Sequence, residues 1–586
     1  MSAVLLVPAF PGFEWWFTAW FAFIPLLLAV EREKESAGRS FATGWLFGTI
    51  FFFGTCWWLT FSPIRYAGFP TLLAYGLMLG VSLTVGLFPA IFAALLSVLL
   101  KRIGTYAILS APFIWIFTEF LRFWATGNNW NALAYSQAFS DGVLKYAEIG
   151  GIYLVGFLVL AYQSLVFFIF LRGRSWMENS KTAPFYVALL AGILGPAVFF
   201  SKSLRKKLKE FDAEGGISQD ALLPNIAIVF ILPCLWGFIP DPLEGSAPRG
   251  PLSIASDSVT VIAIQPNVPM DGLSGAQYEE LKRRHITSVE GAFRANLPRM
   301  IDRKVEESTK AGNSATDRNL WVSIMSMQFQ QQPRVVIFPE SPMNFMYEED
   351  KEFQEWVRAF AVKNKASVLF NSAEPDPSNK KYFNSAVMVD ASGKKAAQYD
   401  KIYLLPFGES VPAPLQGIVP ALVGNFSYGK EYDLLPFGDA KAGIMICFES
   451  HFPGLSREYV NEGADILVEM TNDGYLGPTP VLRQHLANAV FRAVETRRPL
   501  LRVTNVGISA FINERGEVLD PTAGYAEDTR VWNVSRSDGG KTFYVKYGDW
   551  FAWLSALVTL GLLIFAAGKR SRSSVSKARE LDGDKS

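Results

Sequence analysis

Long apolar blocks, separated by short polar segments, fill residues 1–240 of the chain, and one more block follows near the C-terminus. Blocks of about 20 apolar residues span a bilayer as helices, because lipid offers no hydrogen-bond partner to backbone amides. The blocks are residues 13–30, 41–61, 70–100, 106–123, 149–171, 183–200, 224–239 and 550–568. The pattern predicts a multi-span α-helical membrane domain at 1–240 and a C-terminal transmembrane helix at 548–568.

Parts of this region are less regular. Residues 1–12 are apolar but short, and no basic segment precedes them, so we interpret them as a truncated helix or a re-entrant piece and not as a signal peptide. The blocks 183–200 and 224–239 are also short, and lysines are frequent between them. One of the two is therefore expected to be re-entrant or interfacial, with 201–223 as an insertion. A linker is expected at 241–257.

Residues 258–535, here called the lobe, show a different pattern. Short apolar runs rich in β-branched residues are typical of strands covered on both faces. Strands are expected at 259–265, 335–338, 367–371, 385–389, 443–447, 465–469, 501–504 and 509–513, and helices at 274–310, 349–364, 452–462 and 479–497. The residues Asn513–Gly516 predict a hairpin turn, and 311–333 forms no clear element. The pattern indicates an α/β domain attached to the spans.

The distribution of charge predicts the orientation of the spans in the membrane and limits the classes of partner that are expected. Lys569, Arg570 and Arg572 open a basic tail at 569–586, which is expected to be cytoplasmic and puts the lobe on the opposite side. Lys101 lies beside another basic residue in a segment that fits a cytoplasmic turn. The net charge is only +1, and no basic face is interleaved with aromatics, so nucleic acid is not an expected partner.

Cys447 stands at the end of an apolar run, two positions before Glu449. The chain has three cysteines, and Cys56 and Cys234 lie in the apolar blocks, as is typical of membrane packing. A thiol at a strand end sits on a rigid element and can face a cleft, which suits a nucleophile. A lone strand cysteine is also often a small buried hydrophobe. Cys447 by itself leaves both interpretations open.

Two further motifs favour the nucleophile. Glu340 ends the apolar run Arg-Val-Val-Ile-Phe-Pro-Glu, and Lys401 and Glu409 flank the turn Pro-Phe-Gly. The order Glu, Lys, Cys, followed by Thr-Asn-Asp around Asn472, resembles the carbon–nitrogen hydrolase (nitrilase) superfamily. The resemblance implies an αββα sandwich that carries a Glu–Lys–Cys triad.

A lobe of this kind between N-terminal spans and one C-terminal span resembles the apolipoprotein N-acyltransferase family. Segments 117–137, 265–269 and 500–509 resemble that family's arm, first lobe strand and lobe end. The resemblance implies that Glu340 is the general base. It also implies that Lys401 stabilises the oxyanion, helped by the backbone N–H that follows Cys447. The supporting residues that it implies are Glu409, Glu449, Phe448 and Asn472.

The chain departs from the family pattern at several positions. Phe448 replaces a tyrosine, so a hydroxyl role is absent there, and Asn128–Asn129 replaces Phe-Pro. A tryptophan expected after 265–269 is missing, and Leu273 or Tyr278 is expected to substitute for it. These departures concern lipid contacts and leave the triad in place.

The resemblance implies an N-acyltransferase of the bacterial cytoplasmic (inner) membrane with its catalytic domain on the periplasmic side. The expected donor is a phospholipid, typically phosphatidylethanolamine. The expected acceptor is the α-amino group of the S-diacylglyceryl cysteine at the N-terminus of a lipoprotein. A membrane-anchored amidase that hydrolyses a small amide is the alternative, and water access to the thioester distinguishes the two. A third possibility, a non-catalytic scaffold, is disfavoured by the three polar residues retained in apolar flanks.

Metal and cofactor chemistry is not expected. The sequence has no C-x-x-C pair and no histidine cluster, and its three histidines are His285, His451 and His485. For His451 and His485, a surface position or a satisfied place in the core is expected.

Overall fold

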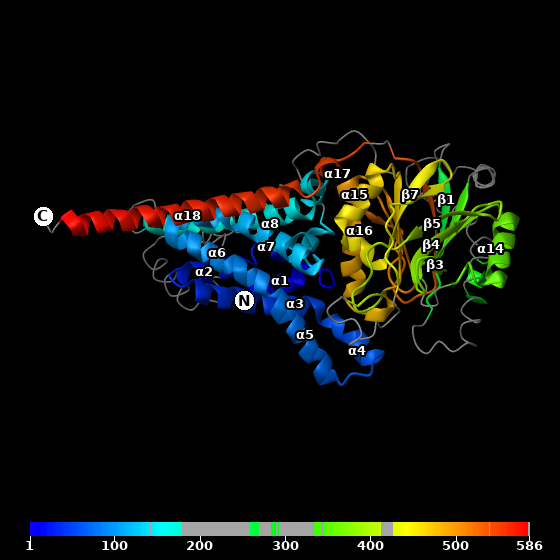
Figure 1. Ribbon diagram of the computed structural model, residues 1–586, viewed down its shortest axis with the longest axis horizontal. Helices are drawn as coiled ribbons and strands as arrows, with labels where there is room; N and C mark the ends of the chain where they lie inside the picture. Colours follow the sequence, from blue (N-terminus) through cyan, green and yellow to red (C-terminus); the bar gives the residue numbers. More distant parts are fainter. Residues whose placement is uncertain are drawn as a thin grey trace, which may run out of the picture. The chain divides into compact units, whose positions relative to one another are not determined.

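The computed structural model describes residues 1–140, 142–177, 258–268, 283–284, 286–288, 291, 333–340, 345–411, 426–537 and 540–583. The chain divides into two compact units (Figure 1). The first, here the membrane unit, holds Met1–Thr60, Phe69–Ser246 and Asp549–Ser586, and the second, the catalytic unit, holds Phe61–Gly68 and Ala247–Gly548. The predictions for 183–200, 201–223, 224–239, 241–257, 311–333, Leu273 and Tyr278 lie outside the described residues, as does nearly all of 274–310.

The described part of the membrane unit consists of helices joined by turns and loops, and it contains no strand. Its main helices are α1 (Ser2–Leu6), α2 (Ile24–Arg32), α3 (Ala37–Cys56), α5 (Thr71–Val85), α6 (Leu87–Ile103), α7 (Ala111–Thr126), α8 (Ala147–Met177) and α18 (Trp550–Gly583). Among the described residues, five helical stretches are long and apolar enough to cross a membrane: Ala37–Arg65, Thr71–Ile103, Thr105–Thr126, Leu144–Leu171 and Trp550–Gly568. The blocks predicted at 41–61, 70–100, 106–123, 149–171 and 550–568 are thereby confirmed as long helices.

The prediction of one spanning helix at 13–30 is wrong. The chain forms a short 3-10 helix, η2 (Trp16–Trp20), and then starts α2 at Ile24 with Pro25 in its first turn. Proline lacks the N–H that a continuous helix requires, so it begins a helix more readily than it continues one. Residues 1–12 form the equally short α1 and η1 (Val7–Ala9).

Glycine lets α3 and α6 approach each other closely. A Cβ on Gly44 would lie 2.4 Å from the carbonyl oxygen of Pro89, and one on Gly48 would lie 2.9 Å from the Cα of Gly86. Small residues at such contacts allow helix backbones to pack without any hydrophobic driving force from lipid. The contact of α3 with α6 therefore depends on the missing side chains.

The catalytic unit contains two six-stranded sheets. The first has the order β12-β1-β2-β3-β4-β5, and the second has the order β11-β10-β9-β8-β7-β6. The strands of the first sheet are β1 (Val259–Gln265), β2 (Arg334–Ile337), β3 (Ser367–Pro375), β4 (Tyr382–Val389), β5 (Lys395–Asp400) and β12 (Asp528–Val534). Those of the second are β6 (Leu434–Phe437), β7 (Ala440–Ile446), β8 (Ile466–Thr471), β9 (Leu500–Thr504), β10 (Ala510–Ile512) and β11 (Val518–Leu519).

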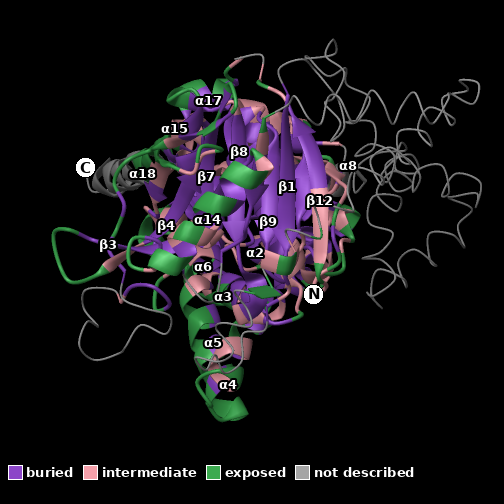
Figure 2. Ribbon diagram, turned by 90° about the vertical axis from the view of Figure 1, so that its right-hand side faces the viewer, coloured by how far each residue is buried: buried purple, intermediate pink, exposed green. Residues whose placement is uncertain are grey.

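Helices cover the outer faces of the two sheets, so the unit is an αββα sandwich, as predicted (Figure 1). The helix α14 (Lys351–Asn364) packs on β3 and β4, while α15 (Pro453–Asn461) packs on β7 and α16 (Val481–Thr496) on β9 and β10. Figure 2 shows the central strands of both sheets as buried. All eight predicted strands and the three described predicted helices are confirmed, and Asn513–Gly516 forms the predicted turn between β10 and β11.

The four strands missing from the prediction lie at or near sheet edges. The edge strands are β5, β12, β6 and β11. β5 reads Lys-Ala-Ala-Gln-Tyr-Asp, β6 contains Pro436, β11 has two residues and β12 begins with three polar residues. Edge strands are only half covered and carry polar residues or proline, so they lack the apolar run that identifies a central strand.

Three neighbouring interior strands of each sheet are parallel: β1, β2 and β3 in one sheet and β7, β8 and β9 in the other. Glu340 follows β2, Cys447 follows β7 and Asn472 follows β8. The carboxyl ends of parallel strands lie at one edge of their sheet, which is where α/β folds gather functional side chains.

We expect opposite stability effects from two glycine-to-alanine changes in the membrane unit. Gly76→Ala in α5 meets no atom within 4 Å, so the higher helix propensity of alanine should stabilise the protein by about 1 kcal/mol. Gly44→Ala should instead destabilise it by about 1–3 kcal/mol through overpacking against α6. Thermal unfolding of both variants in the same detergent measures the difference. Shifts in the same direction would show that close packing at Gly44 does not hold α3 on α6.

Candidate active site

Cys447 occupies a strained turn at the end of β7. Its φ is +52°, in the left-handed region, and it begins the 3-10 helix η9 (Cys447–His451). This conformation costs a residue with a Cβ about 1–2 kcal/mol. Such strain persists only where the surroundings impose it, and it is concentrated at functional sites. The thiol is thus presented on a sharp strand-to-helix turn instead of being packed inside the strand.

Glu449 imposes that turn. One carboxylate oxygen accepts a hydrogen bond from Ile446 N at 2.8 Å, and the other accepts from Ile402 N at 2.7 Å, Tyr403 N at 3.0 Å and Tyr399 OH at 2.7 Å. The side chain is fully buried, and burial raises the pKa of Glu449 to about 7. Because Ile446 belongs to one sheet and Tyr399 to the other, this carboxylate ties the cysteine turn to the segment that carries Lys401.

Lys401 lies between two carboxylates. Its Nζ is 3.6 Å from Glu340 Oε1 and 2.9 Å from Glu409, and the residue is only 1% exposed. Burial alone would lower the pKa of Lys401, but the two carboxylates outweigh it and the pKa is raised. The lysine is therefore a fixed cation at neutral pH. Glu409 Oε2 also accepts from Leu405 N at 2.8 Å, which holds the Pro-Phe-Gly turn.

Asn384 was not predicted, although it holds both carboxylates. Its Nδ2 donates to Glu340 Oε1 at 3.3 Å and to Glu409 Oε1 at 2.6 Å, while its Oδ1 accepts from Asn371 Nδ2 at 2.6 Å. The signal in the sequence was a buried amide inside each of two largely buried strands, β3 and β4. Buried amides need partners, and these two select the position of Glu340.

Burial keeps the proton on the thiol and prepares Glu340 to take it. The pKa of Cys447 is raised well above its usual value, first by burial and then by the charge of Glu340. Burial also raises the pKa of Glu340, although Lys401 opposes the shift, and Glu340 hydrogen-bonds the thiol. A neutral thiol beside a carboxylate of raised pKa is the arrangement that general-base activation of a nucleophile requires.

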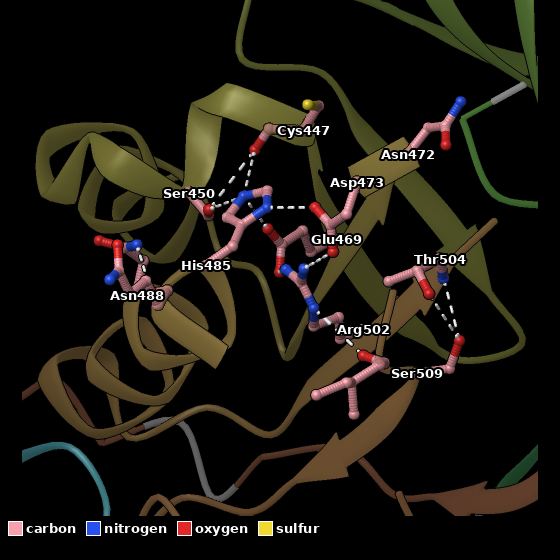
Figure 3. Close-up of polar contacts among 12 residues, drawn as sticks. Cys447, Ser450, Glu469, Asn472, Asp473, His485, Asn488, Arg502, Thr504 and Ser509 are labelled. Carbon is pink, nitrogen blue, oxygen red and sulfur yellow. Dashed lines mark hydrogen bonds and ion pairs between the residues drawn. The ribbon is translucent and has the colours of Figure 1, made fainter. Parts of the chain in front are cut away.

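The other predicted site residues surround this group. Phe448 is buried and stacks on His451 with ring centroids 5.0 Å apart. The Oδ1 of Asn472 accepts from Gly474 N at 3.1 Å and from Asn505 Nδ2 at 3.2 Å, so Asn472 organises the loop after β8. Figure 3 shows its side chain directed away from His485.

Both described histidines are satisfied members of the core, one of the two expected placements. His451 Nδ1 lies 2.9 Å from Phe448 O, and His485 Nδ1 lies 2.7 Å from Asp473 Oδ1. Among the residues that the structure describes, no group of histidine, cysteine and carboxylate side chains could hold a metal ion.

Comparison with known proteins decides the family. Residues 2–165 match the model of the apolipoprotein N-acyltransferase N-terminal domain, and 308–542 match the carbon–nitrogen hydrolase model. The chain is 29% identical to the apolipoprotein N-acyltransferase of Geobacter metallireducens, over 98% of this chain and 95% of that protein. It is 25% identical to that of Thermotoga maritima, over 96% of this chain and 91% of the relative. The chain belongs to the apolipoprotein N-acyltransferase family.

As a member of this family, the protein is a membrane-embedded acyltransferase of the carbon–nitrogen hydrolase superfamily. It is similar in part to solved nitrilase-superfamily structures. One is Nit3 of Saccharomyces cerevisiae (17% identity, TM-score 0.31), which is matched over 49% of this chain and 93% of that one. Another is an amidase of Nesterenkonia sp. (16% identity, TM-score 0.31), matched over 49% of this chain and 94% of that one. At these TM-scores neither structure bears on the reaction.

Removing the Asn384 amide should move the pH dependence of acyl transfer. The Asn384 hydrogen bond lowers the pKa of Glu340, so Asn384→Leu should raise that pKa further. Activity requires the carboxylate form of Glu340. On lowering the pH, the variant should therefore lose activity at a higher pH than wild type does. The acidic limb of the rate–pH profile, compared with wild type, measures this shift. An unmoved limb would mean that Glu340 is not the group whose ionisation the limb reports.

Proposed function

We propose that the protein transfers a fatty acyl chain from a phospholipid, through a thioester on Cys447, to the α-amino group of the N-terminal S-diacylglyceryl cysteine of lipoproteins. Phosphatidylethanolamine is the proposed donor. The observation that carries the proposal is the group formed by half-buried Cys447 with buried Glu340 and Lys401, in which a neutral thiol faces a base and a fixed cation. Membership of the acyltransferase family supplies the class of reaction.

In the first half-reaction, Glu340 takes the thiol proton as the sulfur attacks the ester carbonyl carbon. A C–S bond forms, and the carbonyl oxygen becomes an oxyanion that the Lys401 ammonium and the Phe448 N–H stabilise. When the intermediate collapses, the ester C–O bond breaks. Glu340 then gives its proton to the departing alkoxide, which leaves as the hydroxyl of a lysophospholipid.

In the second half-reaction, the acceptor amine attacks the thioester carbonyl. Glu340 receives a proton from the amine as the C–N bond forms, and the C–S bond breaks with return of the proton to sulfur. A thioester is far more reactive toward amines than an ester is, so two easier steps replace one hard step. Glu409, Glu449 and Asn472 are proposed as supporting residues that hold Lys401 and the cysteine turn. Phe448 contributes its backbone N–H and an apolar ring.

We propose the bacterial inner membrane as the location, with the catalytic domain at 258–535 on the periplasmic side. Basic residues mark the cytoplasmic ends of membrane helices, and Lys101 and Arg102 lie in the last turn of α6. The basic residues at 569–572 follow the span Trp550–Gly568. The proposed organisation is a polytopic domain at 1–240, a linker at 241–257, the final helix at 548–568 and a cytoplasmic tail at 569–586.

The thioester should form on Cys447 with phospholipid alone. Intact-mass analysis after incubation with phosphatidylethanolamine should show one added acyl chain, which hydroxylamine removes and which is absent from Cys447→Ala. Lysophospholipid should be released before any acceptor is added. An adduct that persists in Cys447→Ala, or release of lysophospholipid only when both substrates are present, would exclude this mechanism.

Two engineered cysteines should report the topology. Lys394→Cys places a thiol in the exposed turn between β4 and β5, and Lys101→Cys places one at the exposed end of α6. An impermeant maleimide should label the first in intact spheroplasts and the second only after lysis. Labelling in the reverse order would place the catalytic unit in the cytoplasm.

A further inference from the structure

Four charged side chains are buried together beneath the cysteine turn. They are Glu469 of β8, Asp473, His485 of α16 and Arg502 of β9, and none is more than 4% exposed. Arg502 pairs with both carboxylates: its guanidinium contacts Glu469 Oε2 and lies 2.8 Å from Asp473 Oδ2. The proposed reaction steps use none of these groups, and burying four charges is costly unless their arrangement is tightly matched.

The two ring nitrogens of His485 both face carboxylates. Nδ1 lies 2.7 Å from Asp473 Oδ1, and Nε2 lies 3.0 Å from Glu469 Oε1. The Asp473 carboxylate at Nδ1 and the Cys447 carbonyl oxygen, 3.2 Å from Nε2, can only accept hydrogen bonds, so both nitrogens must carry hydrogen and the ring is an imidazolium. Glu469 lies beside Nε2 as an ion pair without a hydrogen bond to it. With Arg502 this gives two positive and two negative charges in the cluster. The raised pKa of His485, about 9, agrees with this assignment.

The imidazolium also reaches the nucleophile's own backbone. Nε2 lies 3.2 Å from the carbonyl oxygen of Cys447 and 3.1 Å from Ser450 Oγ. Figure 3 shows the Cys447 carbonyl directed toward His485 and the sulfur directed away from it. In a planar trans peptide the N–H points opposite to the C=O. The N–H of Phe448 therefore points away from His485, as the sulfur does.

We propose that His485 is a positioning residue that orients and polarises the Cys447–Phe448 peptide, so that the Phe448 N–H stabilises the oxyanion formed at Cys447. A hydrogen bond from a cation to a peptide oxygen strengthens the donor at the other end of that peptide. The same hydrogen bond also holds the strained turn at Cys447 in place. The inference rests on the proposed thioester chemistry, because it concerns the oxyanion of that reaction.

His451 provides a matched comparison. It is as buried as His485, its ring centroid lies 5.1 Å from that of His485, and its Nδ1 lies 2.9 Å from the carbonyl oxygen of Phe448, one peptide further on. Burial holds the pKa of His451 well below its usual value, so its ring is neutral. The groups facing the His485 ring are then Asp473, Glu469 and Arg502, together with neutral His451 and the Cys447 turn.

The test compares acyl loading with simple alkylation in His485→Gln, His451→Gln and wild type. Transfer of an acyl chain from phosphatidylethanolamine to Cys447, here called loading, passes through the oxyanion. Alkylation of Cys447 by iodoacetamide does not, and it is measured by mass spectrometry on the peptide that contains Cys447. We expect His485→Gln to load roughly 10- to 100-fold more slowly with alkylation within threefold of wild type, and His451→Gln to load within threefold of wild type. Equal loading by His485→Gln, or a parallel loss of alkylation, would overturn the proposal.

A pH profile supplies a second readout that does not depend on whether His485→Gln folds. Wild-type loading should fall as the pH rises through about 9, where the imidazolium loses its proton, while alkylation should not fall. Asp473→Asn removes one carboxylate and should move this limb to lower pH; an unmoved limb would overturn the proposal. Absence of any acyl adduct in wild type would instead refute the thioester function, so the two failures are distinguishable.

Discussion

The site depends on one carboxylate, that of Glu449, which joins the two sheets of the sandwich. Its four hydrogen bonds reach Ile446 at the end of β7 and Tyr399, Ile402 and Tyr403 around the end of β5. Without that link, the cysteine turn would have one unpaired buried N–H, that of Ile446, and the lysine segment would have two partly buried ones. A fully buried unpaired group costs about 1–3 kcal/mol. The distance between the nucleophile and the cation is thus set by backbone contacts.

Around the Glu449 link, the buried polar side chains are paired with one another. Lys401 has two acids, the acids share Asn384, and the amide of Asn384 is fixed by Asn371. Beneath the turn, Glu469 and Asp473 are matched by Arg502 and His485. Charges taken out of water need such partners, and in return each side chain has a single low-energy position. Rigidity at the site therefore follows from the requirement to satisfy buried charge.

The sequence predicted the central strands because buried parallel strands leave continuous apolar runs, and the resemblance to the carbon–nitrogen hydrolase superfamily implied the sandwich. It also named Glu340, Lys401 and Cys447, since each stands in or just after such a run and their order matches a known superfamily. Asn384 and the His485 cluster were missed, because they come from strands and helices distant in sequence and only folding brings them together. The span expected at 13–30 failed for a local reason, namely the proline that begins α2.

The raised pKa of the Cys447 thiol has a consequence for survival outside the cytoplasm. Peroxides and disulfide-exchange catalysts react with thiolates and hardly at all with thiols. A cysteine that keeps its proton until an ester is bound is therefore nearly inert to both. In the oxidising periplasm proposed for this domain, free thiols are normally converted to disulfides. Burial would let the enzyme keep a reduced nucleophile there without any dedicated reductant.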